Sequence, residues 1–183
     1  MSGWPGSAQG QAQCRPTRPD AQGPFYRTGA PGRAAIAAPE EPGVRLIIRG
    51  RVLAADCTTP LAGAVLDVWQ ADAGGAYHDD RLRGRIRADT GGRYEILSIR
   101  PGAYRIDGGR RPAHVHFTIS REGYRPLTTQ LYFAGDPYLA PNDACGRYCR
   151  SDDPDRIVRL AAEEKMGAEF LTGGFDIVLE PAR

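Results

Sequence analysis

From residue 44 onward the chain is a succession of short apolar stretches separated by Gly, Pro and Asp. Apolar stretches of this length, bounded by turn residues, are typical of β-strands. The alternation is clearest in residues 62–72, where Leu66 and Val68 fall on one face of a strand and Asp67 and Trp69 on the other. Strands are predicted in residues 44–56, 62–72, 111–120, 127–133 and 173–181, with two more in residues 84–99.

Two segments predict a hairpin and a helix. The two strands of residues 84–99 flank the sequence DTGG, whose composition is a strong β-hairpin signal. Residues 151–167 predict the one helix, because Asp153 suits the N-cap, Pro154 the first helical position and Gly167 the end. The segment RIVRL inside it would by itself also suit a strand.

Six or more short strands at this spacing predict an all-β fold. We expect a β-sandwich of short, mostly antiparallel strands with long loops and at most one or two short helices. Residues 45–183 are expected to form this single domain. Residues 1–44 are rich in Pro, Gly, Ala and Gln and predict an extended N-terminal arm, in which GPFY is the expected aromatic anchor.

Targeting signals and charge exclude several classes of protein. The first residues, MSGWPGSAQGQAQ, have neither a basic n-region nor an apolar h-region, so they predict a flexible tail rather than an intact signal peptide. No run of 18 apolar residues occurs, which predicts no membrane span. The net charge of +2, from 24 basic and 22 acidic residues, does not indicate a nucleic-acid-binding protein. A cytoplasmic and an exported location both stay open.

Four cysteines lie in loop-like surroundings. An even number is compatible with two disulfides. Cys145 and Cys149 would close a small loop, and Cys14 and Cys57 would tie the arm to the domain. Four unpaired thiols are an equally open interpretation. A zinc site is disfavoured, because no second pair lies at ligand spacing.

The candidate chemistry centres on YRIDGGRRPAHVHF, residues 104–117, which holds two of the three histidines of the chain. Residues i and i+2 of a strand point to the same side, so His114 and His116 would present two imidazoles on one face. By itself, an H-x-H pair in a strand is more often a structural detail than a metal site. The tyrosines nearby, and Arg111 three residues before His114, favour the metal site.

The donor types indicate which metal would bind. The H-x-[DE] pattern of two-histidine, one-carboxylate iron sites is missing here, and so are nearby cysteines. Phenolate is a hard anionic donor that suits a trivalent ion such as Fe³⁺, and a bound ferric ion keeps a phenol ionised at neutral pH. Two tyrosinates and one hydroxide would cancel three positive charges, which lowers the cost of burying the site.

Four motifs in order, VWQADAGGAYHD, GRYEILSIRPGAY, RRPAHVHF and TTQLYFAGDPY, resemble the intradiol ring-cleaving dioxygenases. The protocatechuate 3,4-dioxygenase branch is the most similar. The resemblance runs from about Cys14 to Leu179, and DAQGPFY is similar to the EGPYY-like N-terminal segment of the family.

The resemblance implies a ferric ion whose ligands are Tyr77, Tyr104, His114 and His116. Tyr77 resembles the axial ligand that leaves the metal when substrate binds, and Tyr104 the tyrosine that stays. Arg111, chosen over Arg110 because it directly precedes a proline, resembles the arginine placed where negative charge develops on the substrate ring. Gln130 resembles a glutamine that lines the same pocket, although a strand glutamine also satisfies backbone groups.

The implied reaction inserts oxygen between the two hydroxyl-bearing carbons of a catechol and gives a cis,cis-muconate-type product. The displaced Tyr77 and a hydroxide would accept the two catechol protons, Fe(III) would act as Lewis acid and template, and Arg111 would supply fixed positive charge. The implied partners are a small catecholic aromatic and O2, with no organic cofactor, no nucleic acid and no membrane. Assembly into a homo-oligomer stays open.

Several neighbouring residues have plainer interpretations. His78 is expected to be a solvated loop histidine, with a ligand role as the competing interpretation. Trp69, Tyr132 and Phe133 are expected in the core. Tyr26 of GPFY is placed at the pocket rim.

Two departures from the family leave the substrate open. The catechol and hydroxyquinol branch carries a helical N-terminal domain, which residues 1–44 cannot form, and the protocatechuate branch commonly pairs a catalytic with a non-catalytic chain. Single-domain members are the closest overall fit. The competing interpretation is a non-enzymatic binding module, because DTGGRYEILSIRPGAY is also typical of transthyretin-like and carboxypeptidase-regulatory-like sandwiches. Such a module has no need of the four ligands together.

Overall fold

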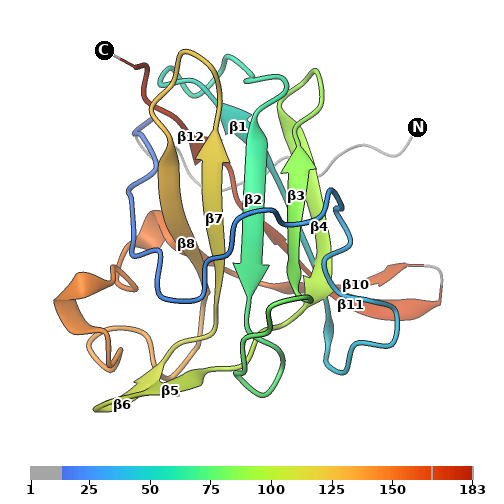
Figure 1. Ribbon diagram of the computed structural model, residues 1–183, viewed down its shortest axis with the longest axis vertical. Helices are drawn as coiled ribbons and strands as arrows, with labels where there is room; N and C mark the ends of the chain where they lie inside the picture. Colours follow the sequence, from blue (N-terminus) through green and yellow to red (C-terminus); the bar gives the residue numbers. More distant parts are fainter. Residues whose placement is uncertain (1–13, 166, 183) are drawn as a thin grey trace.

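Two five-stranded sheets face each other in the computed structural model, which describes residues 14–165 and 167–182 (Figure 1). The first sheet consists of β1 (Arg45–Leu53), β4 (Arg93–Ile99), β10 (Ala161–Lys165), β11 (Ala168–Gly174) and β12 (Ile177–Val178). The second has the order β3 (Arg83–Arg87), β2 (Val65–Gln70), β7 (His114–Ser120), β8 (Leu127–Phe133) and β9 (Ile157–Val158). A separate two-stranded ribbon pairs β5 (Tyr104–Ile106) with β6 (Gly109–Arg111).

The hydrophobic core lies between the two sheets and is made of alternate residues of their strands. Leu66 and Val68 of β2, and Val115 and Phe117 of β7, are buried in one cluster with residues of β1 and β4. Most strand pairs are antiparallel; β11 and β12 pair with β1, and β9 with β8, in parallel. The prediction of an all-β sandwich is confirmed. The alternation also turns His114 and His116 to the outer face of the second sheet.

The predicted hairpin is wrong in its pairing, although both of its strands exist. β3 pairs with β2, and β4 pairs with β1, so the two strands belong to different sheets. The turn itself forms, because the Asp89 carboxylate accepts hydrogen bonds from the backbone N–H groups of Gly91 and Arg93. The DTGG turn is therefore a corner at which the chain crosses from one sheet to the other.

The predicted helix over residues 151–167 is also wrong beyond its first turn. The Asp153 side chain caps the 3-10 turn η2 (Pro154–Arg156), as the sequence indicates, but the chain then continues as β9 and β10. The β-branched Ile157 and Val158 suit a strand, and β9 adds to the edge of β8. The other short helix is η1 (Gly146–Tyr148). Tertiary pairing has overridden the local capping signal.

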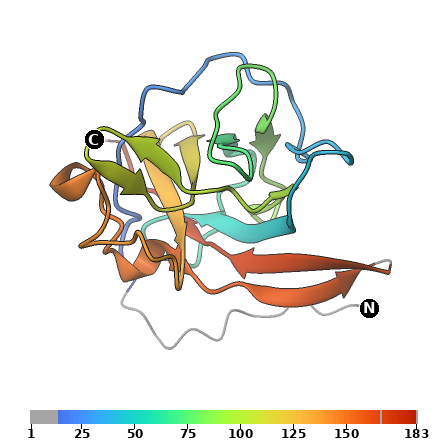
Figure 2. The ribbon, with the colours of Figure 1, turned by 90° about the horizontal axis from the view of Figure 1, so that it is seen from below.

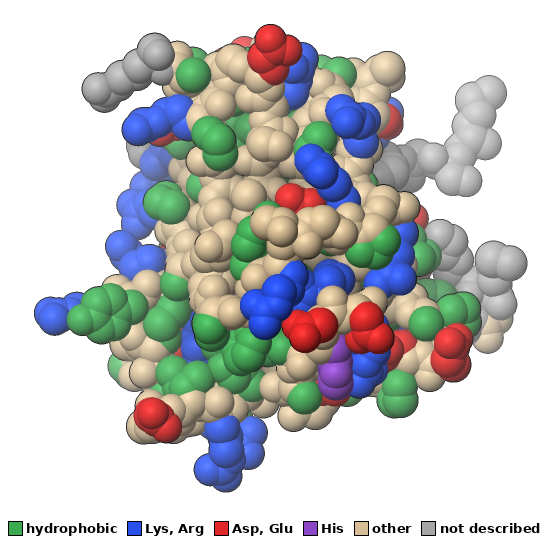
Figure 3. All heavy atoms as spheres, in the orientation of Figure 1, with side chains coloured by type: hydrophobic (Ala, Val, Ile, Leu, Met, Phe, Trp, Pro, Cys, Tyr) green, Lys and Arg blue, Asp and Glu red, His purple; other side chains and the backbone are tan. Residues whose placement is uncertain are grey.

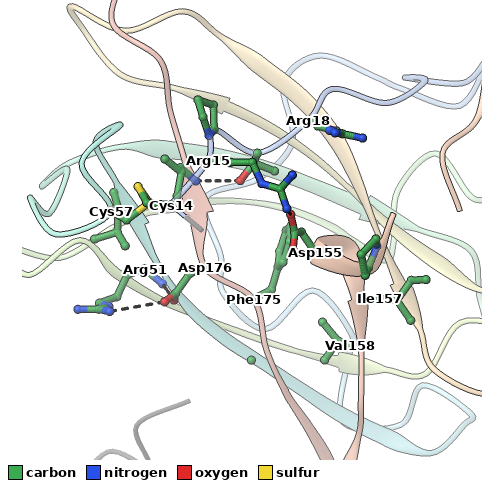
Figure 4. Close-up of a pocket in the computed structure, with 16 residues that line it drawn as sticks. Cys14, Arg15, Arg18, Arg51, Cys57, Asp155, Ile157, Val158, Phe175 and Asp176 are labelled. Atoms are coloured by element: carbon green, nitrogen blue, oxygen red, sulfur yellow. Dashed lines mark hydrogen bonds and ion pairs between the residues drawn. A yellow bond between two sulfur atoms is a disulfide. The ribbon is translucent and has the colours of Figure 1, made fainter. Parts of the chain in front are cut away.

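The described part of the arm, residues 14–44, runs across the outer face of the second sheet (Figures 1 and 2). Figure 4 shows how its start is held: Cys14 is bonded to Cys57, and Arg15 faces Asp155 at 3.6 Å. The Cys145–Cys149 disulfide also forms, so both disulfides are present. The predicted tail, residues 1–13, lies outside the described residues.

The surface carries both signs of charge without a large patch of one sign on the face in Figure 3. Within the described residues, no helix is long and apolar enough to cross a membrane. The cavity in Figure 4 measures about 240 Å³ and lies where the arm meets β1 and β12. None of the predicted site residues lines it.

Candidate metal centre and active site

The candidate site lies on the outer face of the second sheet, beneath the arm. Strand register places its members side by side, because His116 is opposite Trp69 on one neighbouring strand and opposite Gln130 on the other. His114 is opposite Tyr132 in the same way. These side chains share a face by the two-residue period of a strand, and each is at most 2% exposed.

Three donor atoms converge at the centre of this face. The hydroxyl of Tyr77 lies 3.1 Å from Nε2 of His114 and 3.1 Å from Nε2 of His116, and the two Nε2 atoms are also 3.1 Å apart. Metal–imidazole bonds are about 2.0–2.1 Å long, so donors at this spacing fit neighbouring positions around one ion. The sequence predicts Tyr77 beside the histidine pair on motif resemblance alone.

Aromatic rings enclose the three donors. Tyr104, at the start of β5, meets the Tyr77 ring edge-on with centroids 5.5 Å apart, and its ring lies 5.6 Å from that of His114. Trp69 stacks on His116 at 4.8 Å. Phe25 of the arm stacks on Tyr77 at 4.2 Å. All four predicted ligands are thus neighbours. For Tyr104 this follows from the contacts of its ring with Tyr77 and His114.

The loop that carries Tyr77 packs closely against the backbone just before Tyr104. The Asp72 carboxylate accepts hydrogen bonds from the backbone N–H groups of Gly74 and Ala76, which shapes the loop before Tyr77. Gly75 has φ +89°, and a Cβ there would lie 2.5 Å from the Ala103 carbonyl oxygen, next to Tyr104. Only glycine allows the two tyrosine loops to approach this closely.

His78 makes its contacts outside the cluster of the three donor atoms. Its Nε2 lies 2.8 Å from Asp72 Oδ2 and 2.7 Å from an Arg81 nitrogen, so it belongs to a charged cluster at the edge of the Tyr77 loop. The geometry therefore favours the structural interpretation of His78. Trp69 and Tyr132 are buried as expected, but they face the site rather than the core between the sheets. Of the GPFY segment, Phe25 contacts Tyr77, whereas Tyr26 contacts Trp69.

The protonation of the two imidazoles suits a bound cation. Nδ1 of His114 lies 2.6 Å from the Pro112 carbonyl oxygen and must carry the proton, so Nε2 of His114 presents a bare lone pair. Nδ1 of His116 is buried with no hydrogen-bond partner among the described residues. The hydroxyl of Tyr77 at 3.1 Å and Nη1 of Arg111 at 3.5 Å both reach Nε2 of His114. A cation between the two Nε2 atoms would bind their lone pairs, with Nδ1 of His116 as the protonated nitrogen.

The protonation states fit the same interpretation. Burial, and then the charge of Arg111, lowers the pKa of His114 to about 3. Burial, followed by His114 and Arg111, lowers the pKa of His116 well below its ordinary value, so both imidazoles are neutral, the form that binds metals. Burial, followed by the charge of Tyr104, raises the pKa of the Tyr77 phenol, which stays protonated until a cation takes its place.

Loading the metal-free protein with a trivalent ion is expected to release at least one proton per ion. The reason is that Tyr77 is a neutral phenol before loading, so metal affinity should fall as the pH falls. Redox-silent Ga³⁺ provides the measurement, because the tyrosinate absorbance in the near ultraviolet should rise on loading and should rise less in Tyr77→Phe. An unchanged tyrosine spectrum on stoichiometric binding would contradict the prediction.

Arg111 lies beside the donors at the end of β6, with its guanidinium fixed by several acceptors. Nε and Nη2 donate to the Asp143 carboxylate at 3.2 and 3.3 Å, and Nη2 also donates to Gln130 and Tyr132 at 3.1 Å each. Nη1 faces Nε2 of His114 at 3.5 Å. Burial opposes the charged form, but the hydrogen bonds that Arg111 donates to Asp143 outweigh it and raise the pKa of Arg111.

Sequence reasoning missed three residues of this surrounding network: Asp20, Asp143 and Arg156. They come from the arm, from the loop before η1 and from the segment predicted as a helix. Asp143 is 5% exposed and Arg156 is 0% exposed. A buried charge leaves no periodic signal in the sequence, so only the fold could bring these residues to the site.

Comparison with known proteins places this sandwich among enzymes with the same architecture. A sequence profile of the family described as Dioxygenase matches residues 21–181, most of the chain. A chlorocatechol 1,2-dioxygenase of Pseudomonas sp. (strain P51) is 35% identical over 92% of this chain and 72% of its own length. The beta chain of a protocatechuate 3,4-dioxygenase of Burkholderia cepacia is 38% identical over 75% of this chain and 65% of its own length.

A solved structure agrees with these relatives. The crystal structure of 3-chlorocatechol 1,2-dioxygenase from Rhodococcus opacus 1CP superposes with a TM-score of 0.82 at 30% identity, over 93% of this chain and 75% of that one. The fold and site define an all-β enzyme domain with a buried cluster of histidines and tyrosines. The chain belongs to the intradiol ring-cleaving dioxygenases, a family that uses non-haem iron. The predicted family and enzyme class are confirmed, and they disfavour the non-enzymatic module.

Proposed function

We propose that this chain uses Fe(III), held by Tyr77, Tyr104, His114 and His116, to cleave a small catechol between its hydroxylated carbons with O2. The observation that carries this proposal is the set of three donor atoms at mutual distances of 3.1 Å, buried beside Arg111. When bound, the ferric ion would supply Lewis acidity and a template for the catechol oxygens. The expected product is a cis,cis-muconate-type dicarboxylate.

The residues of the chain perform the remaining tasks. Tyr77 is the ligand that we expect to leave and to accept a catechol proton at its phenolate oxygen, because its loop lies at the edge of the site under Phe25. Tyr104 belongs to the paired ribbon β5–β6 and is expected to stay. The aromatic rings of Phe25 and Trp69 keep water away from the donors.

Arg111 is proposed to stabilise the negative charge that develops on the substrate ring. Its Nη1 faces the donors, whereas Nε and Nη2 are occupied by Asp143, Gln130 and Tyr132. A guanidinium held in this way provides positive charge that needs no reorganisation during the reaction. Gln130 has a positioning role, because its Oε1 accepts from Arg111 while its Nε2 donates to the Ala21 carbonyl oxygen at 2.5 Å.

The substrate is expected to be a catechol, since relatives named for chlorocatechol and for protocatechuate both match this chain. Turnover of catechol, chlorocatechol, hydroxyquinol and protocatechuate, measured by the dicarboxylate product, identifies the preferred ring. An enzyme acting on a larger catechol would turn over none of these four, yet its visible spectrum would still shift when a catechol binds.

The visible spectrum of the iron-loaded protein tests the ligand set. Tyrosinate-to-Fe³⁺ charge transfer should make the protein red-brown, and Tyr77→Phe and Tyr104→Phe should each weaken the band. Tyr138→Phe is the matched control, because this tyrosine lies beside Arg110 rather than beside the donors. A colourless protein that retains no iron after reconstitution would refute the assignment.

A further inference from the structure

A buried ion pair joins the arm to the far side of the active site. Asp20 of the arm and Arg156 of η2 form it, and both side chains have 0% exposure. Oδ2 of Asp20 also accepts from the Tyr132 hydroxyl at 2.9 Å and from the backbone N–H of Arg150 at 3.2 Å. Removing two charges from water often costs as much as their attraction returns, so stability alone is a weak reason for such a pair.

The hydrogen bonds of Tyr132 run in one direction, from Arg111 to Asp20. Nη2 of Arg111 donates to the Tyr132 oxygen at 3.1 Å, so this oxygen is an acceptor. The hydroxyl has one proton, and the carboxylate of Asp20 is a stronger acceptor than the Gln130 amide oxygen at the same 2.9 Å. The chain of donors is therefore Arg111 to Tyr132 to Asp20.

We propose that Asp20 is a positioning residue that acts on Arg111 through Tyr132, an inference that rests on the proposed function. The negative carboxylate polarises the Tyr132 hydroxyl and makes its oxygen a better acceptor for Arg111. Asp143 holds the guanidinium through Nε and through Nη2. Between these two carboxylates, the guanidinium is fixed with Nη1 toward His114.

The arm thereby contributes the Asp20 carboxylate to the active site as well as the Phe25 ring. Arg156 compensates the Asp20 charge and is in turn bonded to Asp153 at 3.2 Å. The Asp20 backbone N–H donates to the Thr128 carbonyl oxygen, and the Thr129 hydroxyl donates to the Arg18 carbonyl oxygen, which fixes this part of the arm on β8. The Asp20 carboxylate is accordingly in a defined position before substrate arrives.

The first test variant is Tyr132→Phe, which removes one hydroxyl and retains the ring and the Asp20–Arg156 pair. We expect kcat to fall about tenfold with KM changed less than about twofold, because the hydrogen bond orients a group that acts in the transition state. The iron content and the visible band should match those of the wild type, because Tyr132 is not one of the proposed ligands. An unchanged kcat would overturn the proposal.

Asp20→Asn, made alone and together with Tyr132→Phe, tests whether Asp20 acts on Arg111 through Tyr132. Alone, it should lower kcat about tenfold. In the Tyr132→Phe background it should lower kcat less than about twofold, because the hydroxyl that joins Asp20 to Arg111 is already missing. A purely structural role, or an effect through the arm and Phe25, predicts the same loss in both backgrounds and would overturn the proposal. Asp155→Asn, which removes the exposed arm contact with Arg15, is the matched control and should retain full activity.

A separate measurement distinguishes failure of this inference from failure of the proposed function. If the wild type binds no iron and turns over no catechol, the proposed function fails by itself. Urea unfolding of metal-free Asp20→Asn, Arg111→Lys and the double variant requires no turnover, and the two changes should be non-additive. Additive losses would overturn the connection between Asp20 and Arg111, and this readout also applies if Asp20→Asn folds too poorly for kinetics.

Discussion

His114→Ala is expected to abolish both iron retention and ring cleavage. The imidazole supplies one of three donors at mutual distances of 3.1 Å, and its tautomer is fixed by the Pro112 carbonyl oxygen 2.6 Å from Nδ1. Even replacing a group that only supports a ligand typically lowers metal affinity about 10- to 100-fold, so removing the ligand itself should exceed that. Iron per chain after reconstitution and catechol turnover are the two measurements.

The matched control for this prediction is His78→Ala. His78 directly follows Tyr77 in the sequence, but its Nε2 lies 2.8 Å from Asp72 Oδ2 and 2.7 Å from an Arg81 nitrogen. This variant should retain iron and its visible band. Loss of iron in His78→Ala together with retention in His114→Ala would reverse the ligand assignment.

Arg111→Lys is expected to lower kcat about 100- to 1,000-fold while iron stays bound. Lysine preserves the charge but lacks the planar fork that bonds Asp143, Gln130 and Tyr132 together. Loss of one preorganised group that stabilises developing charge typically has an effect of this size. Steady-state kinetics on the preferred catechol, with iron content measured in parallel, checks the prediction.

Arg110→Lys is the control for the arginine. Arg110 precedes Arg111 directly, yet its guanidinium lies over the Tyr138 ring, 5.9 Å from the centroid. We expect a change in kcat of less than about threefold, as for most partly exposed substitutions. A larger loss in Arg110→Lys than in Arg111→Lys would contradict the choice between the two arginines.

Much of the site was predictable because local sequence and strand geometry dictate it. The two-residue period of a strand turns His114 and His116 to one side, and the structure has both Nε2 atoms 3.1 Å apart. Pairing of Cys14 with Cys57, one of the open alternatives, is also present. The choice of Tyr77 and Tyr104 depended on resemblance, since no periodicity connects a loop residue to a strand far along the chain.

Sequence failed where tertiary pairing competed with a local signal. DTGG is a good turn, but whether its flanking strands pair with each other depends on which sheet offers each strand an edge. Residues 151–167 carry a good N-cap at Asp153, yet β8 offers Ile157 and Val158 a partner that a helix would not use. Local propensity is a weak prior that such contacts override.

The sequence by itself determined the sandwich, the two histidines on one strand face and the family. Short-range physics explains the sandwich and the histidine pair, because side-chain alternation and turn chemistry act within a few residues. The family was inferred from the resemblance of four motifs. Only the tertiary structure decided that Asp20, Asp143 and Arg156 enclose Arg111, and that the arm covers the donors. Each of these contacts joins segments far apart in the chain, and a buried charge is tolerated only where folding brings its partner to it.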